Sequence, residues 1–314
     1  MKIAVLFPGQ GSQYLGMGRE FLDASPDCRE IMEITERVCD APIGKLCLEG
    51  PMEELTRAIY LQPAITAVNL MCWRMLQKTL PAGVEIGCFA GHSLGEYSAL
   101  HAAGVISTES TIRLVAERGA LMWREGLKNP GGMRAVLGLN IEEVERHIGN
   151  CPEAARVTSA NHNTEQQIVI SGDIAGLDQV SKKLEEAGAK VIPLNVSVAN
   201  HSPLVADAVP EFARFMEDIE FSSPHTPVYF NVTSAEEFNT AKIKEIMATQ
   251  IASRVRWYET ILKMVDSGVH TFIEVGPKTI LKGMMRKIVP KGVKVNSLQF
   301  DSPESLKSCM EKLT

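Results

Sequence analysis

The motif Gly-His-Ser-Leu-Gly at residues 91–95 constrains this chain more than any other part of its sequence. It follows the short apolar run 86–90 and precedes a helical pattern over 96–103. A Gly-x-Ser-x-Gly turn between a strand and a helix bends the backbone sharply at the serine, which only small neighbours tolerate. The first amides of the helix then point at one spot, where they stabilise developing negative charge. We therefore predict that Ser93 is a nucleophile and that the Leu94 N–H is an oxyanion donor.

A serine nucleophile needs a base, and the chain offers seven histidines. Five are excluded by their position. His92 adjoins the serine, and His101 lies further along its helix. His147 ends an amphipathic helix, His225 lies in a Pro-rich loop, and His270 begins a strand. His201 and His162 remain, and His201 lies in a loop after the apolar-alternating run 191–198, where catalytic groups are usually carried. Without the serine motif, a plain surface-loop histidine would be an equally good interpretation of His201.

Arg118 is the second unusual residue, because it lies on the apolar side of a helix predicted to run from Ser107 to about Glu125. A guanidinium stays charged when it is buried, and leaving it unpaired costs several kcal/mol. Its partner is either a carboxylate of the protein or a carboxylate of a ligand. Buried ion pairs are the commoner case, but the nucleophile motif upstream favours a ligand.

The bulk composition indicates a compact, soluble, intracellular protein. With 314 residues, 45% hydrophobic and 22% charged, the chain has room for one large domain with a smaller insertion. A net charge of −6 argues against a general nucleic-acid binder. No apolar run approaches the length of a membrane span and no export signal is visible, so we expect a cytoplasmic location. Seven cysteines without a Cys-x-x-Cys pair fit a reducing compartment better than disulfides or a metal site.

The order of predicted elements indicates two domains. Four prolines, Pro26, Pro42, Pro51 and Pro63, divide the helical region 15–80 into several short helices. After the hinge at 129–132, the pattern becomes strand, helix, strand, strand, helix, strand, which is the ferredoxin-like order.

Beyond residue 195 the pattern of strands separated by helices, typical of the first part of the chain, resumes. Strands are predicted near 227–232, 269–274 and 293–298. We predict a large α/β-hydrolase-like catalytic domain with a central, mostly parallel sheet, formed by 1–128 and 197–314. Residues 129–196 are predicted to form a small inserted ferredoxin-like α+β subdomain.

With these residues in place, the chain resembles the malonyl-CoA:acyl carrier protein transacylases over essentially its whole length. The segments that carry the resemblance are Phe-Pro-Gly-Gln-Gly-Ser-Gln at 7–13, Gln-Pro-Ala at 62–64, Gly-His-Ser-Leu-Gly-Glu at 91–96, Arg-Gly at 118–119, Asn-His at 200–201, Gln250 ahead of Val-Arg-Trp at 255–257, and Glu-Val-Gly-Pro at 274–277.

The resemblance implies a ping-pong transfer of malonyl from coenzyme A, through an ester on Ser93, to the phosphopantetheine thiol of an acyl carrier protein in fatty acid synthesis. His201 would act as base and then acid, and Gln250 would orient it without a triad aspartate. Arg118 would bind the malonyl carboxylate, and the amides of Gln10 and Leu94 would form the oxyanion hole. No metal or other cofactor is implied.

Three alternatives share parts of this pattern. A stand-alone polyketide acyltransferase would have the same catalytic residues, an acyl hydrolase tends to lack the arginine, and a non-catalytic carrier-docking module has no need of a strained serine. The chain also departs from the usual family pattern at 163–167, at Arg134 and after Lys278. The segment Val-Ala-Asn-His at 198–201 matches neither of the tetrapeptides that accompany malonyl or methylmalonyl in polyketide relatives.

A basic cluster near the C-terminus indicates a second contact surface. It consists of Lys278, Lys282, Arg286, Lys287, Lys291 and Lys294. These cations would meet an acidic carrier protein or the coenzyme A phosphates, and a simple solvated face is an equally good interpretation.

Overall fold

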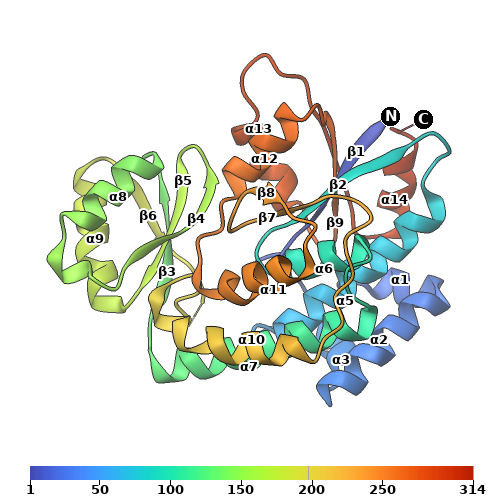
Figure 1. Cartoon of the computed structure of the whole chain (residues 1–314), viewed down its shortest axis with the longest axis horizontal. Coiled ribbons are helices and arrows are strands. Elements are labelled where there is room, and N and C mark those ends of the chain that lie inside the picture. The colour runs from blue at the N-terminus through green and yellow to red at the C-terminus, as the bar shows by residue number, and fades with distance from the viewer. Residues whose placement is uncertain (197, 314) are drawn as a thin grey trace.

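The computed structural model describes residues 1–196 and 198–313 and shows two sheets, each with its own helices (Figure 1). The larger sheet has the order β10-β9-β1-β2-β7-β8. Its adjacent strands are parallel except for the β7–β8 pair. The strands are β1 (Lys2–Phe7), β2 (Glu85–Gly91), β7 (Val228–Phe230), β8 (Ala235–Glu236), β9 (Thr271–Val275) and β10 (Asn296–Phe300). The predicted α/β class with a mostly parallel central sheet is confirmed.

Both faces of this sheet are buried, as expected for parallel strands covered by helices. In β1, Ile3, Val5 and Phe7 point into one apolar core, while Ala4 and Leu6 point into another. The second core is closed by α12 (Trp257–Asp266) and α13 (Ile280–Ile288).

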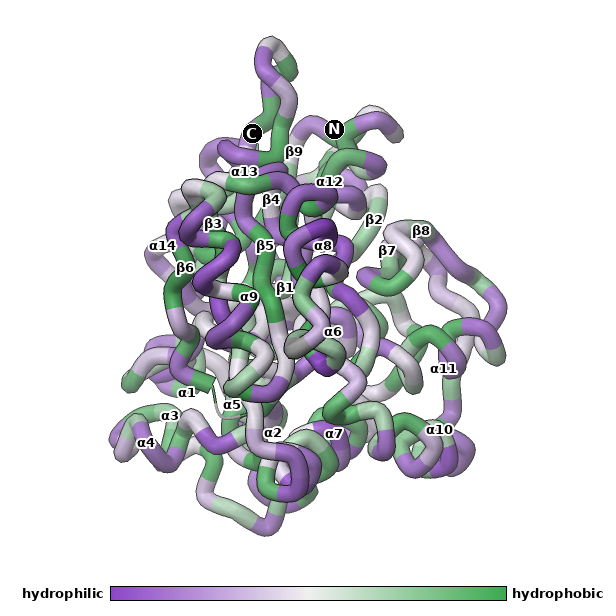
Figure 2. Tube along the Cα trace, turned by 90° about the vertical axis from the view of Figure 1, so that its left-hand side faces the viewer, coloured by the Kyte–Doolittle hydropathy of each residue, from purple (hydrophilic) through white to green (hydrophobic). Residues whose placement is uncertain are grey.

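The first core is closed by the remaining helices of the large domain, whose traces alternate hydrophilic and hydrophobic residues along α7 and α10 (Figure 2). They are α1 (Arg19–Ala24), α2 (Pro26–Cys39), α3 (Ile43–Glu49), α4 (Met52–Leu55), α5 (Ala58–Thr79), α6 (Gly95–Ala102), α7 (Thr108–Lys128), α10 (Val209–Glu217), α11 (Thr240–Thr249) and α14 (Pro303–Met310). Two 3₁₀ turns, η2 (Pro203–Ala208) and η3 (Gln250–Ala252), complete the domain.

The prediction that Pro63 separates two short helices is wrong. Pro26 begins α2, and Pro42 and Pro51 precede α3 and α4, but Pro63 lies inside the 22-residue helix α5. Positions 61–73 of α5 are buried without a break, so the packing of α5 overrides the local preference of proline to end a helix.

The smaller sheet has the order β4-β5-β3-β6, with antiparallel neighbours throughout. Its elements are β3 (Gly132–Leu137), α8 (Ile141–Gly149), η1 (Pro152–Ala154), β4 (Thr158–Thr164), β5 (Gln167–Gly172), α9 (Ile174–Glu186) and β6 (Lys190–Pro193). This is the predicted ferredoxin-like arrangement, with α8 and α9 covering one face through a separate apolar core. The exact domain boundaries stay a prediction, and the one at residue 197 lies outside the described residues.

The other face of the small sheet looks toward the large domain. Met133 and Val169, from β3 and β5, lie on that face and line a cavity that also contains Ser93. The two domains are joined directly, since the His162 N–H donates to the Val255 carbonyl at 2.8 Å. The cavity therefore lies at the carboxyl ends of β1 and β2, where ligands usually bind in open α/β sheets.

Candidate active site

The turn between β2 and α6 has the strained geometry that the motif predicts. Ser93 has φ of 50°, in the left-handed region that a residue with a Cβ rarely adopts. The neighbouring glycines leave the space that the turn requires, because a Cβ on Gly91 would lie 1.9 Å from the Gly95 carbonyl carbon and one on Gly95 would lie 2.1 Å from the Phe7 oxygen.

Ser93 and His201 are brought together across more than a hundred residues. The Ser93 Oγ lies 2.8 Å from Nε2 of His201, which is 4% exposed. The His201 Nδ1 faces two carbonyl oxygens, that of Gln250 at 3.0 Å and that of Ser253 at 2.9 Å. Because carbonyls only accept hydrogen bonds, Nδ1 carries the ring proton and Nε2 is left to accept the serine proton.

The protonation state of His201 suits a base. Burial, and then the positive charge of Arg118, lower the pKa of His201 to about 3. The ring is therefore neutral at physiological pH, and Nε2 has a free lone pair.

Arg118 lies beside Ser93 and forms no salt bridge in the described part of the chain. Its Nη2 donates to Ser93 Oγ at 3.0 Å and to Gln250 Oε1 at 3.1 Å, while its Nη1 donates to Gln62 Oε1 at 2.8 Å. Its Nε–H is buried without a partner, and the side chain is 2% exposed. Burial lowers the pKa of Arg118 from its ordinary value, and the guanidinium also lies over the Tyr97 ring at 5.8 Å. A buried cation whose direct hydrogen-bond partners are all neutral groups is suited to bind an anion.

The two predicted oxyanion donors belong to neighbouring loops. Gln10 follows β1 and Leu94 follows β2, and these strands pair in parallel up to Phe7 and Gly91. The loops are in close contact, because a Cβ on Gly9 would lie 2.4 Å from the His92 oxygen and 3.5 Å from the Leu94 nitrogen. In residues 1–196 and 198–313, neither the Gln10 N–H nor the Leu94 N–H donates to a protein acceptor.

Gln250 contacts His201 through its backbone, not its side chain. The carbonyl of Gln250 accepts from the imidazole, whereas its side-chain Nε2 donates to the Ser93 carbonyl at 2.7 Å. The same Nε2 donates to Glu96 Oε2, and Oε1 accepts from Arg118.

Three buried polar residues that the sequence analysis did not select complete this cluster. Gln62 holds Arg118, while Glu96 and Asn231 hold the serine turn. The sequence signal that could have marked Gln62 and Glu96 as site residues was their place inside the segments that carry the family resemblance. Asn231 follows a short strand and no sequence pattern marked it.

Comparison with known proteins identifies the family. The profile of the acyl transferase domain family matches residues 5–299. A malonyl CoA-acyl carrier protein transacylase of Bacillus subtilis is 34% identical over 314 residues, covering 99% of this chain and 97% of that protein. The chain belongs to the malonyl-CoA:acyl carrier protein transacylase family.

Two further matches extend this result. A polyketide biosynthesis malonyl CoA-acyl carrier protein transacylase of Bacillus subtilis is 37% identical, covering 91% of this chain and 96% of that protein. The solved structure of a malonyl-transacylase in complex with a type II polyketide acyl-carrier protein is 34% identical with a TM-score of 0.94, covering 99% of this chain and all of that one.

In this transacylase, neither His162, the other candidate base, nor His92 hydrogen-bonds to the Ser93 oxygen. His162 lies in β4, which continues to Thr164. Its Nδ1 pairs with Glu259 at 3.1 Å, so it holds the two domains together. His92 contacts Asn163 of the subdomain at 2.8 Å and not the nucleophile.

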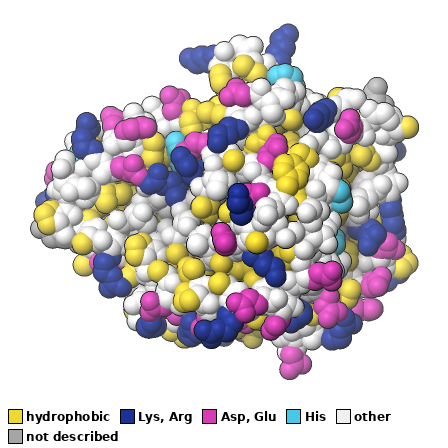
Figure 3. All heavy atoms as spheres, in the orientation of Figure 1, with side chains coloured by type: hydrophobic (Ala, Val, Ile, Leu, Met, Phe, Trp, Pro, Cys, Tyr) yellow, Lys and Arg dark blue, Asp and Glu magenta, His cyan; other side chains and the backbone are white. Residues whose placement is uncertain are grey.

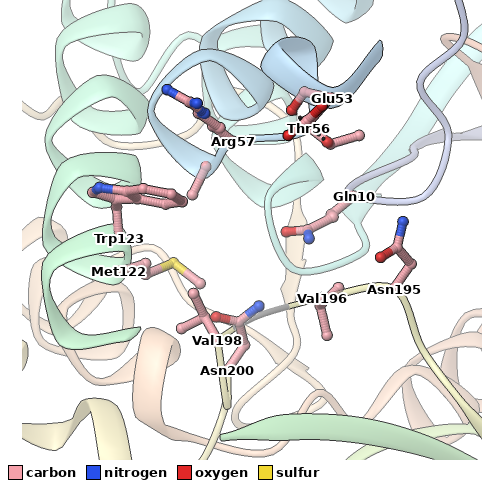
Figure 4. Close-up of a pocket in the computed structure, with 11 residues that line it drawn as sticks. Gln10, Glu53, Thr56, Arg57, Met122, Trp123, Asn195, Val196, Val198 and Asn200 are labelled. Carbon is pink, nitrogen blue, oxygen red and sulfur yellow. Dashed lines mark hydrogen bonds between the residues drawn. The ribbon is translucent and has the colours of Figure 1, made fainter. Parts of the chain in front are cut away.

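The cavity that contains Ser93 has a volume of about 160 Å³ and is lined by apolar side chains as well as by the polar cluster. A second cavity of about 300 Å³ adjoins it and shares Gln10, Met122, Val196 and Asn200. Figure 4 shows Trp123 and Arg57 on one side of this second cavity and Gln10 on the other. The space around Ser93 therefore extends along the side of α7 into the second cavity.

Among the described residues, no group of three or more His, Cys, Asp or Glu side chains is arranged to hold a metal ion. No helix in the same part of the chain is long and apolar enough to cross a membrane.

Proposed function

We propose that this transacylase moves a malonyl group from coenzyme A to the phosphopantetheine thiol of an acyl carrier protein through an ester on Ser93. The observation that carries the proposal is the Ser93–His201 hydrogen bond of 2.8 Å beside Arg118, a buried cation that no described carboxylate pairs. The nucleophile, its base and a counter-ion for an acidic acyl group thus lie within one cavity.

In the first half-reaction, the Ser93 Oγ attacks the thioester carbonyl and its proton passes to His201 Nε2. The N–H groups of Gln10 and Leu94 would hold the tetrahedral oxyanion, since neither has a described protein acceptor. Collapse breaks the carbon–sulfur bond, and His201 returns the proton to the departing thiolate.

The second half-reaction reverses these steps with the carrier thiol. His201 removes the thiol proton, the thiolate attacks the malonyl ester, and Ser93 Oγ leaves with the proton. The carbonyls of Gln250 and Ser253 keep the imidazole oriented in both halves. They perform the orienting role of a triad aspartate without adding a negative charge.

Arg118 selects the acyl group in this proposal. Its unpartnered Nε–H and the Nη2–H now on Ser93 Oγ are two donors of one guanidinium edge. A carboxylate accepts two such parallel hydrogen bonds, so malonyl would bind far better than a neutral acyl group such as acetyl.

The basic cluster is proposed to receive the acidic carrier protein. The chain has no acidic residue between Glu274 and Asp301, and the six cations form no salt bridge with a described residue. Three side chains of α13, Ile280, Leu281 and Met284, line the cavity around Ser93, so the helix that carries Lys282, Arg286 and Lys287 forms part of the cavity wall. In Figure 3, Lys and Arg side chains stand at the projecting top of the molecule, over the loop after α13. A phosphopantetheine arm could thus enter beside its docked carrier.

A charge reversal tests this surface. Arg286→Glu with Lys287→Glu should raise the KM for the carrier about tenfold or more and leave malonyl-CoA loading unchanged. The matched control is Lys182→Glu, on the outer helix α9, which should change neither half-reaction. A raised KM for malonyl-CoA alone would assign the cluster to the coenzyme A phosphates instead.

Intact-protein mass spectrometry tests the main proposal. The protein is mixed with malonyl-, methylmalonyl- or acetyl-CoA, and the adduct is then chased with a carrier protein. We expect a malonyl adduct on Ser93 that the carrier removes. The absence of an adduct, or its loss to water at the same rate without the carrier, would contradict a transferase.

We further propose that the protein works in fatty acid synthesis in the cytoplasm and that its chemistry needs no cofactor besides the substrate. Supplying fatty acid and polyketide carrier proteins in parallel would test the pathway.

A further inference from the structure

A buried polar cluster lies directly beneath the serine turn. Glu96, in the first turn of α6, and Asn231, just after β7, are both 0% exposed. The proposed chemistry gives neither residue a step. Their side chains nevertheless hold the Ser93 N–H and the Gly91 carbonyl directly, and the Ser93 carbonyl through the Gln250 amide.

Asn231 bridges the two sides of the bend. Its side-chain Oδ1 accepts from the Ser93 N–H at 2.7 Å, and its Nδ2 donates to the Gly91 carbonyl at 2.8 Å. The left-handed conformation of a residue other than glycine costs about 1–3 kcal/mol and persists only where its surroundings enforce it. The Asn231 amide does so by satisfying two backbone groups that the bend takes out of the regular structure.

Glu96 joins this bridge to the rest of the site. Its Oε1 accepts from the Asn231 backbone N–H at 2.6 Å, and its Oε2 accepts from the Gln250 side-chain amide. The Gln250 Nε2 therefore faces two acceptors, Glu96 and the Ser93 carbonyl. Its Oε1 is consequently turned toward Arg118, which donates to it at 3.1 Å.

We propose that Asn231 and Glu96 are positioning residues that hold Ser93 in its reactive conformation and set the orientation of the Gln250 amide against Arg118. In the absence of the Asn231 bridge, the Ser93 Oγ would sample positions outside hydrogen-bond reach of His201. Glutamine at position 96 offers one acceptor oxygen to two donors, so its NH₂ would face either the Asn231 N–H or the Gln250 NH₂. The first orientation displaces Asn231 and its bridge, and the second makes Gln250 move away from Ser93 or rotate its amide and lose the bond from Arg118.

The test uses two substitutions, Glu96→Gln and Asn231→Ala. Ser93 acylation is followed by rapid quenching and mass spectrometry over a range of malonyl-CoA concentrations. A misplacement of about 1 Å can cost about 100-fold in rate, so we expect the first-order rate constant to fall about 10- to 100-fold. The half-saturating concentration should stay within about threefold of wild type, because the coenzyme A contacts are untouched.

A matched control separates positioning from stability. Glu274 is also a buried carboxylate, 1% exposed, with its two oxygens accepting from the N–H groups of Leu281 and Lys282. Glu274→Gln removes a comparable carboxylate without touching the serine turn. It should lower the melting temperature as much as Glu96→Gln does, but keep the acylation rate constant within about threefold.

The inference rests on the proposed function only through its substrate, so a second probe is included. A small fluorophosphonate labels a reactive serine without needing Arg118 or coenzyme A. Wild type that reacts with the probe but not with malonyl-CoA would overturn the proposed function alone. Variants that react with the probe as fast as wild type would overturn the positioning role, and so would an equal loss of rate in Glu274→Gln.

Discussion

The arginine assignment yields the sharpest quantitative prediction. Arg118 is 2% exposed, so a carboxylate bound to it is withdrawn from water together with it. Removing one partner of such a buried pair costs about 3–5 kcal/mol. Water can enter the space that alanine leaves, so the lower value applies, and about 3 kcal/mol corresponds to roughly 100-fold in rate.

The assay compares two acyl donors in the same variant. Arg118→Ala also leaves the side-chain oxygens of Gln62 and Gln250 without the hydrogen bonds that Arg118 donates. This loss lowers the loading rate equally for every acyl-CoA. We therefore expect the ratio of malonyl to acetyl loading rates, measured by quenched-flow mass spectrometry, to fall about 100-fold. Arg118→Lys should give an intermediate ratio, because an ammonium keeps the charge but not the planar pair of donors.

Arg113→Ala is the matched control, on the same helix α7. Arg113 lies over the Phe215 ring at 5.7 Å, away from the cavity, so its removal should leave the ratio unchanged. A malonyl-to-acetyl ratio in Arg118→Ala within about threefold of wild type would refute carboxylate binding by Arg118.

Further outcomes follow from the geometry. Ser93→Ala should abolish the malonyl adduct, and His201→Ala should slow its formation about 100- to 10,000-fold, as followed by mass spectrometry. Because the pKa of His201 is lowered to about 3, loading should show no decline through pH ~6.5, which a rate–pH profile would reveal. In the unfolded chain, by contrast, His201 gains a proton near pH ~6.5. The free energy of unfolding should therefore fall as the pH drops from there toward 3, by up to about 1.4 kcal/mol per pH unit. Denaturant titrations of wild type and His201→Ala would measure this contribution. Gly91→Ala should prevent folding of the turn, since its Cβ would lie 1.9 Å from backbone, whereas Gly283→Ala, with no heavy atom within 4 Å, should leave the melting temperature equal or higher.

Local patterns predicted the parts of the molecule that depend on local sequence. The serine turn is recognisable from five consecutive residues, and the ferredoxin-like subdomain is built from elements that follow one another within a single stretch of chain. The resemblance, not spacing, pointed to Gln10 and Gln250. Even so, the contact of Gln250 with His201 runs through a backbone carbonyl, which every residue type possesses, so its identity could not reveal that contact.

The missed residues are those whose partners are remote in sequence. Asn231 and Ser93 are 138 positions apart, and Asn231 and Glu96 are 135 apart. Nothing near an isolated asparagine in a loop shows which backbone it will meet. The error at Pro63 has a related cause, because the buried surface that keeps α5 continuous comes from distant elements.

The hydrogen bonds of Arg118 also explain how one residue can be both stable and selective. In the free protein its cation is stabilised by the amide oxygens of Gln62 and Gln250, which carry dipoles but no charge. A carboxylate of the protein in the same place would neutralise the guanidinium and leave little electrostatic attraction for a ligand. Burial lowers the pKa of Arg118 from its ordinary value, and the nearby Tyr97 hydroxyl and Glu96 carboxylate act in the opposite direction. We therefore expect a malonyl carboxylate to pair with this cation and an acetyl group not to, because the direct hydrogen-bond partners of Arg118 are neutral.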